Sequence, residues 1–161
     1  MIQTTIMFPV YPTEDRNVVI TAALNIFPFE PSGLECRVVE EESTIFGDPR
    51  TSYKTTCENC RIIMVGRESL DTLHSLLRQQ GIVETARRMF LGNSIDGTAF
   101  RFMLHKQAAL KNKVHFATPG ESPMGPIAVF IQYKNVRTLI DWLAPPTKDG
   151  IVLEPRGFPL D

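Results

Sequence analysis

The sequence has no long hydrophobic run and no leader of recognisable type. No apolar stretch approaches the roughly 20 residues that a membrane-spanning helix needs. The segment from Met1 to Val10 has neither a basic start nor a small-residue cleavage site. These absences predict a soluble, cytoplasmic protein with no membrane partner.

Motifs of nucleotide, nucleophile and metal chemistry are also missing. Neither the GxGxxG nor the GxxxxGK phosphate-binding pattern occurs, and Ser122 does not lie in a G-x-S-x-G elbow. Cys57 and Cys60 form a single CxxC, whereas zinc usually needs four ligands. We therefore expect no enzyme, no catalytic residue, no metal and no cofactor.

Basic and acidic residues nearly balance over the whole chain, but they are unevenly distributed along it. The 161 residues carry a net charge of only -1. Residues 1–50 contain three basic and eight acidic residues, whereas residues 51–113 contain ten basic and five acidic residues. A segregated positive segment can bind a polyanion even when the whole chain is nearly neutral.

Hydrophobic periodicity predicts a single α+β domain over residues 1–146, with a Pro- and Gly-rich tail at 147–161 that is loosely held. The sheet should be mostly antiparallel, with helices packed on one face. The first expected elements are a strand from Ile2 to Phe8, a helix near Glu14 to Ile26 capped by Thr13, and strands at Leu34 to about Phe46 and Ser52 to Val65. After them we expect a helix capped by Ser69 and ended by Gly81, a helix from Ile82, a strand pair around residues 100–116, a strand at 127–131 and a helix capped by Asn135.

The long hairpin predicted between Leu34 and Val65 turns at residues 47–50, where Gly, Asp and Pro favour a tight reversal. In this hairpin Cys36 and Cys60 could face each other across the two strands. They would be either buried thiols or a disulfide.

The segment from Phe100 to Phe116 is the most informative stretch. Phe100, Phe102 and Leu104 alternate on one strand-like arm, and Val114 and Phe116 alternate on a second. A cationic, amide-rich bend should join the two arms. The candidate nucleic-acid-binding residues are those of the bend together with nearby cations: Arg87, Arg88, Arg101, His105, Lys106, Gln107, Lys111, Asn112 and Lys113.

Several motifs, occurring in a fixed order, resemble an uncharacterised archaeal protein family that is described as predicted RNA-binding. They are Val10–Asp15, Leu77–Ile82 followed by Thr85–Arg87, Leu104–Ala109, Glu121–Ile127 and Leu139–Pro145. The resemblance spans about Ile2 to Gly150. It implies a fold similar to that of ribosomal large-subunit protein five. The chain departs from the family pattern at His105, Asn112 and Met124, where Asn, Gly and Leu are usual.

Two functions compete at this point. The first is a non-catalytic RNA-binding domain that uses the basic mid-chain surface, with structured RNA as its partner. The alternative is a protein-interaction or homo-oligomeric module, such as a homodimer, in which the exposed edge of the long hairpin pairs with a second copy.

Overall fold

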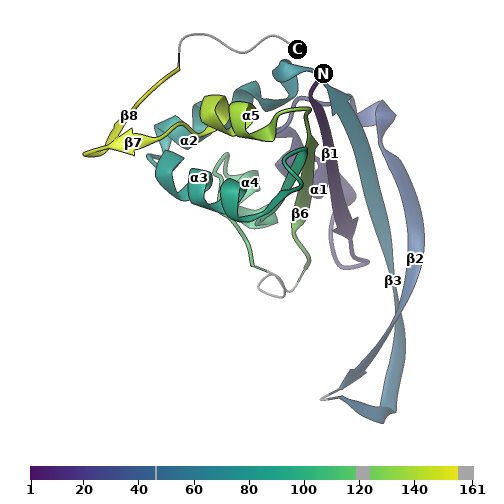
Figure 1. Ribbon diagram of the computed structural model, residues 1–161. Coiled ribbons are helices and arrows are strands. Elements are labelled where there is room, and N and C mark those ends of the chain that lie inside the picture. The colour runs from purple at the N-terminus through teal and green to yellow at the C-terminus, as the bar shows by residue number, and fades with distance from the viewer. Residues whose placement is uncertain (46, 119–123, 156–161) are drawn as a thin grey trace.

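The computed structural model describes residues 1–45, 47–118 and 124–155. Within them, a six-stranded antiparallel sheet has the order β2-β3-β1-β6-β5-β4, and the helices lie on one side of it (Figure 1). The α+β prediction, with one antiparallel sheet covered on one face, is confirmed. Ser122, whose nucleophilic role was not expected, lies outside the described residues.

The strands are β1 (Gln3–Val10), β2 (Glu35–Ile45), β3 (Asp48–Val65), β4 (Ser94–Ile95), β5 (Ala99–Leu104), β6 (Ile127–Gln132), β7 (Thr147–Lys148) and β8 (Ile151–Val152). The helices are α1 (Arg16–Leu24), α2 (Asp71–Gln79), α3 (Val83–Gly92), α4 (Lys106–Leu110) and α5 (Val136–Leu143), with short 3-10 turns at Pro31–Gly33 and Arg67–Leu70.

Strand β1 forms the middle of the core because its side chains alternate. Ile2, Ile6 and Phe8 are buried under the helices, whereas Met7 between them is 49% exposed on the opposite face. The same alternation continues across the hydrogen-bonded neighbours β3 and β6, since directly paired residues share a face. One face of the sheet is thus a hydrophobic core, and the other faces water.

Helix boundaries follow capping chemistry, with two corrections to the sequence predictions. Asp15, not Thr13, caps α1 by accepting a hydrogen bond from the Asn17 amide. Ser69 does not cap α2. It is buried and donates to the carbonyl of Gly66, while its hydroxyl also lies 3.0 Å from that of Thr4 on β1. Ser69 therefore fastens the start of the helix to the sheet.

Two expected caps are confirmed. The side chain of Asn135 accepts a hydrogen bond from the Thr138 amide at the start of α5. Gly81 ends α2 with a φ of 67°, and the amide of Ile82 reaches back to the carbonyl of Leu77. This is the left-handed termination in which glycine is favoured.

The predicted strand pair around residues 100–116 is wrong in its second half. Phe100–Leu104 does form β5, but Lys106–Leu110 folds as α4, and the returning chain touches β5 through a single bridge between Leu104 and Phe116. Ala108 and Ala109 favour a helix at the expected bend. Val114 and Phe116 still point into the core.

The tail differs from expectation over residues 147–155. Strands β7 and β8 pair there as a small ribbon, and the amide of Leu153 donates to the carbonyl of Pro146. Glu154 then forms an ion pair with Arg78 of α2 at 2.6 Å. These contacts hold this part of the tail against the helices.

No helix among the described residues is long and apolar enough to cross a membrane.

Candidate nucleic-acid interface

The structure divides the predicted binding residues between the two sides of the sheet. Arg101 extends from β5 on the face away from the helices, whereas Lys106 to Lys113 belong to the helix layer, where α4 packs on α1. Asn25 at the end of α1 donates from its side chain to the carbonyls of Ala109 and Leu110. The basic mid-chain segment is therefore not one continuous surface.

Lys106 is buried and does not face water, contrary to the sequence prediction. Its ammonium donates to the carbonyls of Pro9 and Met124 and forms an ion pair with Glu14 at 3.0 Å. Only 7% of the Lys106 side chain and 14% of the Glu14 side chain are exposed. Burial lowers the pKa of Lys106, and the hydrogen bond to Glu14 opposes that shift. Lys106 holds three parts of the fold together, so it is not available to a phosphate.

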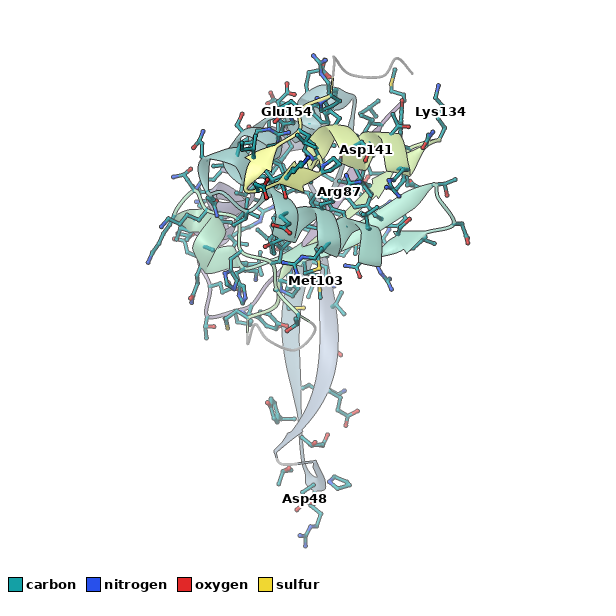
Figure 2. All side chains as sticks on the ribbon, turned by 60° about the vertical axis from the view of Figure 1, so that its left-hand side comes forward. Asp48, Arg87, Met103, Lys134, Asp141 and Glu154 are labelled. Atoms are coloured by element: carbon teal, nitrogen blue, oxygen red, sulfur yellow. The ribbon has the colours of Figure 1, made fainter. Side chains whose placement is uncertain are left out.

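Arg87 is likewise engaged inside the helix layer. Its guanidinium donates to the carboxylate of Asp141 on α5 at 2.8 Å and to the carbonyl of Ala144 at 3.1 Å. Figure 2 shows Arg87 and Asp141 beside each other between α3 and α5. The neighbouring Arg88 is exposed. Of this predicted pair, only Arg88 remains available to a ligand.

The turn after α4 keeps its cations in solvent. Asn112 has a φ of 59°, and the amides of Asn112 and Lys113 donate to the carbonyls of Ala109 and Ala108. This geometry explains why glycine would suit position 112, and asparagine tolerates it among the remaining residues. Lys111, Asn112 and Lys113 are all exposed.

Beside this turn lie four further polar side chains. The rings of His105 and His115 lie 4.5 Å apart, centroid to centroid. Gln107 is exposed on α4, and Gln80, which follows the last residue of α2, exchanges two hydrogen bonds with the backbone of Val114. We call Lys111–Lys113 with His115 the α4 turn. It offers two cations and no other basic group from the predicted set.

A second set of cations lies on the sheet face that the helices leave uncovered, which we call the open face. Arg101 on β5 is paired directly with Phe130 on β6, and Phe130 is paired with Thr5 on β1. The next row across the sheet places Arg61 of β3 beside Met7 of β1. Arginine, aromatic and thioether side chains thus share one surface.

The open face is hollowed between β2, β3, β1 and β6. The hollow has a volume of about 420 Å³. Its lining includes Met7, Glu35, Arg37, Asn59 and Arg61. These residues offer apolar surface, an amide, one carboxylate and two guanidinium groups, and the apolar surface and guanidinium groups suit an unpaired base and its phosphate.

The electrostatics of the open face favour an anion. The side chains of Arg37, Arg61 and Arg101 are exposed, and they form no ion pair or hydrogen bond within the part of the chain that the structure describes. Among the side chains that the structure describes on this face, the acidic one beside them is Glu35, which is paired with Arg61. Three guanidinium groups therefore outweigh one carboxylate.

Sequence reasoning missed Arg37, Arg61 and Phe130 because it grouped cations by closeness along the chain. A usable signal was nevertheless present. Ile6, Val129 and Phe102 alternate with residues that must point to the other face, and Arg101, Phe130 and Met7 occupy those alternate positions. The register between strands brings these residues together, and it cannot be predicted from the sequence of any single strand.

Two of the three cysteines, Cys36 and Cys60, form with Glu58 a cluster whose side chains are of the types that bind metal ions. Cys36 and Cys60 are paired across β2 and β3, as predicted, and both are free thiols whose ligand atoms lie within 4.8 Å of each other and of Glu58. However, Arg16 forms an ion pair with Glu58 at 2.7 Å and donates to the sulfur of Cys36 at 3.3 Å. The guanidinium thus takes the position that a metal cation would need.

The CxxC motif does not supply a chelating pair. Cys57 and Cys60 are three positions apart on β3, so their side chains point to opposite faces of the strand. Burial raises the pKa of Cys60 to about 12, with a contribution from the Cys36 thiol beside it. That shift keeps Cys60 as a neutral thiol.

A family model described as RNA binding matches residues 3–133, which include all six strands of the main sheet but not the separate β7–β8 ribbon. The chain belongs to this family. Its relatives are archaeal proteins named UPF0201. One from Sulfurisphaera tokodaii is 35% identical over 158 residues, covering 94% of this chain and 93% of the relative. One from Methanopyrus kandleri is 39% identical over 144 residues, covering 88% and 83%.

The fold agrees with that membership. A crystal structure of a UPF0201 protein from Methanococcus jannaschii superposes with a TM-score of 0.69 at 28% identity, covering 94% of this chain and 99% of that one. The sequence resemblance to an archaeal family described as RNA-binding is thereby confirmed. The likeness to ribosomal large-subunit protein five stays an expectation.

Proposed function

We propose that this protein is a non-catalytic RNA-binding domain and that RNA lies on the open face of the sheet. The observation that carries the proposal is the set of Arg37, Arg61 and Arg101, which are exposed on three strands of one face with one acidic neighbour. The description of the matching family supports RNA as the polyanion.

The kind of RNA follows from the shape and chemistry of the open face. The face of an antiparallel sheet cannot enter the deep, narrow major groove of double-stranded RNA, but it can receive bases that are not paired. Phe130 and the guanidinium of Arg101 offer planes for stacking, and the hollow beside Met7 has room for a base. We therefore infer a structured RNA that presents unpaired bases in a loop or bulge.

The α4 turn is the competing surface, and it was part of the sequence prediction. It has two exposed lysines, but it adjoins the carboxyl-terminal ends of α1 and α2, whose carbonyl dipoles disfavour a phosphate. The helices among the described residues lie on the other side of the sheet from the open face (Figure 1). A contact from the α4 turn to the same RNA would add to affinity without reading bases.

A matched pair of double variants separates the two surfaces. Arg61→Glu with Arg101→Glu reverses two charges on the open face, and Lys111→Glu with Lys113→Glu reverses two on the α4 turn. The probe is a fluorescein-labelled RNA stem–loop with an unpaired loop, titrated by fluorescence anisotropy. All four residues are exposed, so both variants should fold.

We expect wild-type dissociation constants of about 10⁻⁴ to 10⁻⁶ M that rise steeply with salt. The open-face variant should bind at least roughly tenfold more weakly, whereas the α4-turn variant should change by roughly twofold or less. A larger loss in the α4-turn variant would place the RNA on the helix side. Absence of wild-type binding even at low salt would refute RNA binding.

A further inference from the structure

The long hairpin of β2 and β3 continues well beyond the body of the protein. Strand β1 pairs with β3 only from Glu58 onward, and below that point the described residues of β2 and β3 pair with each other. Figures 1 and 2 show the resulting ribbon projecting past the ends of β1 and β6, with Asp48 at its far tip. We call residues 40–45 and 47–56 the arm.

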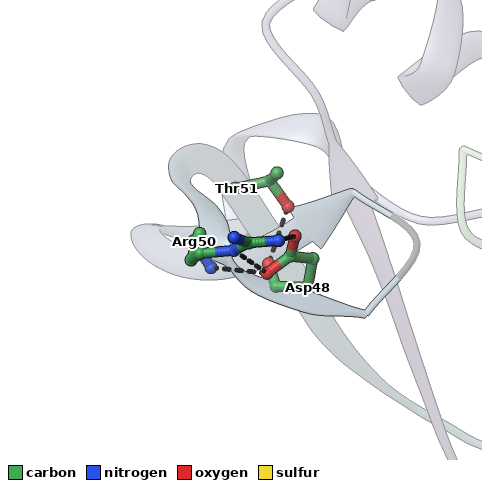
Figure 3. Close-up of polar contacts among 3 residues, drawn as sticks. All are labelled: Asp48, Arg50 and Thr51. Atoms are coloured by element: carbon green, nitrogen blue, oxygen red, sulfur yellow. Dashed lines mark hydrogen bonds and ion pairs between the residues drawn. The ribbon is translucent and has the colours of Figure 1, made fainter.

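The arm is ordered by its own contacts and not by the core. At the tip, Arg50 forms an ion pair with Asp48 at 3.0 Å and donates its amide to the same carboxylate, while the hydroxyl of Thr51 donates to the backbone carbonyl of Asp48 (Figure 3). No described arm residue belongs to the buried core. A two-stranded ribbon without packing is only marginally stable in water, so a partner that covers it would stabilise it.

The two edges of the arm differ in charge. The β2 edge carries three consecutive acids, Glu40, Glu41 and Glu42. Antiparallel pairing of this edge with its own copy would set carboxylates against carboxylates, which is destabilising. Charged residues on an edge strand disfavour pairing with another chain, so we do not expect the β2 edge to pair with the β2 edge of a second copy.

The β3 edge has the opposite character. Ser52–Thr56 reads Ser-Tyr-Lys-Thr-Thr, with no acid, one lysine and residues that favour strands. When this segment meets itself about a two-fold axis centred on Tyr53, tyrosine lies opposite tyrosine and Lys54 lies opposite Ser52. Tyr53 is 49% exposed, which leaves its ring available for that pair.

The position beside this edge is already defined by the fold. From Glu58 onward β1 lies against β3, and below it the same side of β3 continues along the arm. A strand from a second copy would extend the sheet in line with β1. We propose that two copies of this chain associate through the β3 edges of their arms, giving a continuous four-stranded ribbon between two bodies.

The test is the mass in solution of the full chain, measured by light scattering after gel filtration across a dilution series. The wild type should approach twice 18.1 kDa as its concentration rises. Tyr53→Glu places acid opposite acid at the axis and should raise the dimer dissociation constant roughly tenfold. Glu40→Lys changes the other edge of the same arm and should leave the dimer intact.

A second measurement tests the register directly. Tyr53→Cys should form an intermolecular disulfide on mild oxidation, because the two-fold axis brings both new thiols together. Wild type treated identically is the control for Cys36, Cys57 and Cys60. A monomer at every concentration, a dimer that is indifferent to Tyr53→Glu, or one that is broken by Glu40→Lys alone would each overturn the proposal. None of these outcomes depends on RNA.

Discussion

The two sides of the sheet use their basic residues differently. On the helix side, Arg78, Arg87 and Lys106 reach carboxylates and carbonyls and hold elements to one another. On the open face, Arg37 and Arg61 extend into solvent. Both sets come from the same modest pool of 17 basic residues, yet only the second can meet a ligand. A count of charge along a chain therefore says little about charge that is available for binding.

Lys106 gives the most sensitive test of the difference between the buried basic residues of the helix side and the exposed ones. Lys106→Met keeps most of the side-chain volume but removes the ammonium donor from the carbonyls of Pro9 and Met124 and from the Glu14 carboxylate, which then keeps a hydrogen bond from the Tyr11 amide. Because removing one partner of a buried ion pair leaves the other charge uncompensated, we expect a loss of about 3 kcal/mol in the free energy of unfolding. Urea titration followed by circular dichroism measures it.

Lys113→Met is the matched control, since Lys113 is exposed and lies seven residues further along. It should change stability by less than about 0.5 kcal/mol. Equal losses of stability in the two variants would mean that Lys106 contributes no more to the stability of the fold than the exposed Lys113.

Arg87 and Arg88 test the same contrast within one helix. Arg87→Gln removes the hydrogen bonds to Asp141 and Ala144, so we expect a loss of about 1.5 kcal/mol. Arg88→Gln, at an exposed position, should cost almost nothing in stability. Affinity for the RNA stem–loop should be unchanged in Arg87→Gln. A lower affinity in this variant at a temperature where it is fully folded would show that Arg87 also contacts RNA.

The smallest expected effect is the pH dependence of the tail contact. A hydrogen bond from Arg78 lowers the pKa of Glu154 in the folded protein. Its stabilising contribution is therefore present above the ordinary glutamate pKa and is lost as pH falls through the lowered value. Because the Glu154 side chain is 48% exposed, the contribution should stay below about 0.5 kcal/mol.

The melting temperature of Glu154→Gln, compared with that of the wild type over a pH series, measures this effect. The difference should be present at neutral pH and vanish in acid. A gap that persists unchanged at low pH would show that the charge of Glu154 is irrelevant to the tail.

Much of the fold could be predicted because its signals are local. Alternation in Ile2–Phe8, the cap at Asn135 and the stop at Gly81 each depend on neighbouring residues, and each was confirmed. The failures occurred where a distant contact decided the outcome. The sequence around Lys106 predicts an exposed lysine in a loop, but the side chain is buried against Glu14, which is 92 residues away in the sequence.

The candidate site could likewise be predicted only where its residues depend on local sequence. Arg101 was predicted as a binding residue from the basic segment, and the structure leaves it exposed. Arg37 and Arg61 were not predicted, because only the register of β2, β3 and β1 brings them beside Met7 and Pro9. A pattern within one strand shows which face a residue takes but not which residues of other strands join it there.

The α+β class, the order of most elements and membership of an archaeal family could be predicted from the amino-acid sequence alone, because periodicity, turn chemistry and motif order are local properties of the chain. The three-dimensional fold was needed to show which cations are buried, which face the water and how far the arm extends from the body. Burial and strand register depend on residues far apart in sequence, and the energy of a charge is set by those surroundings.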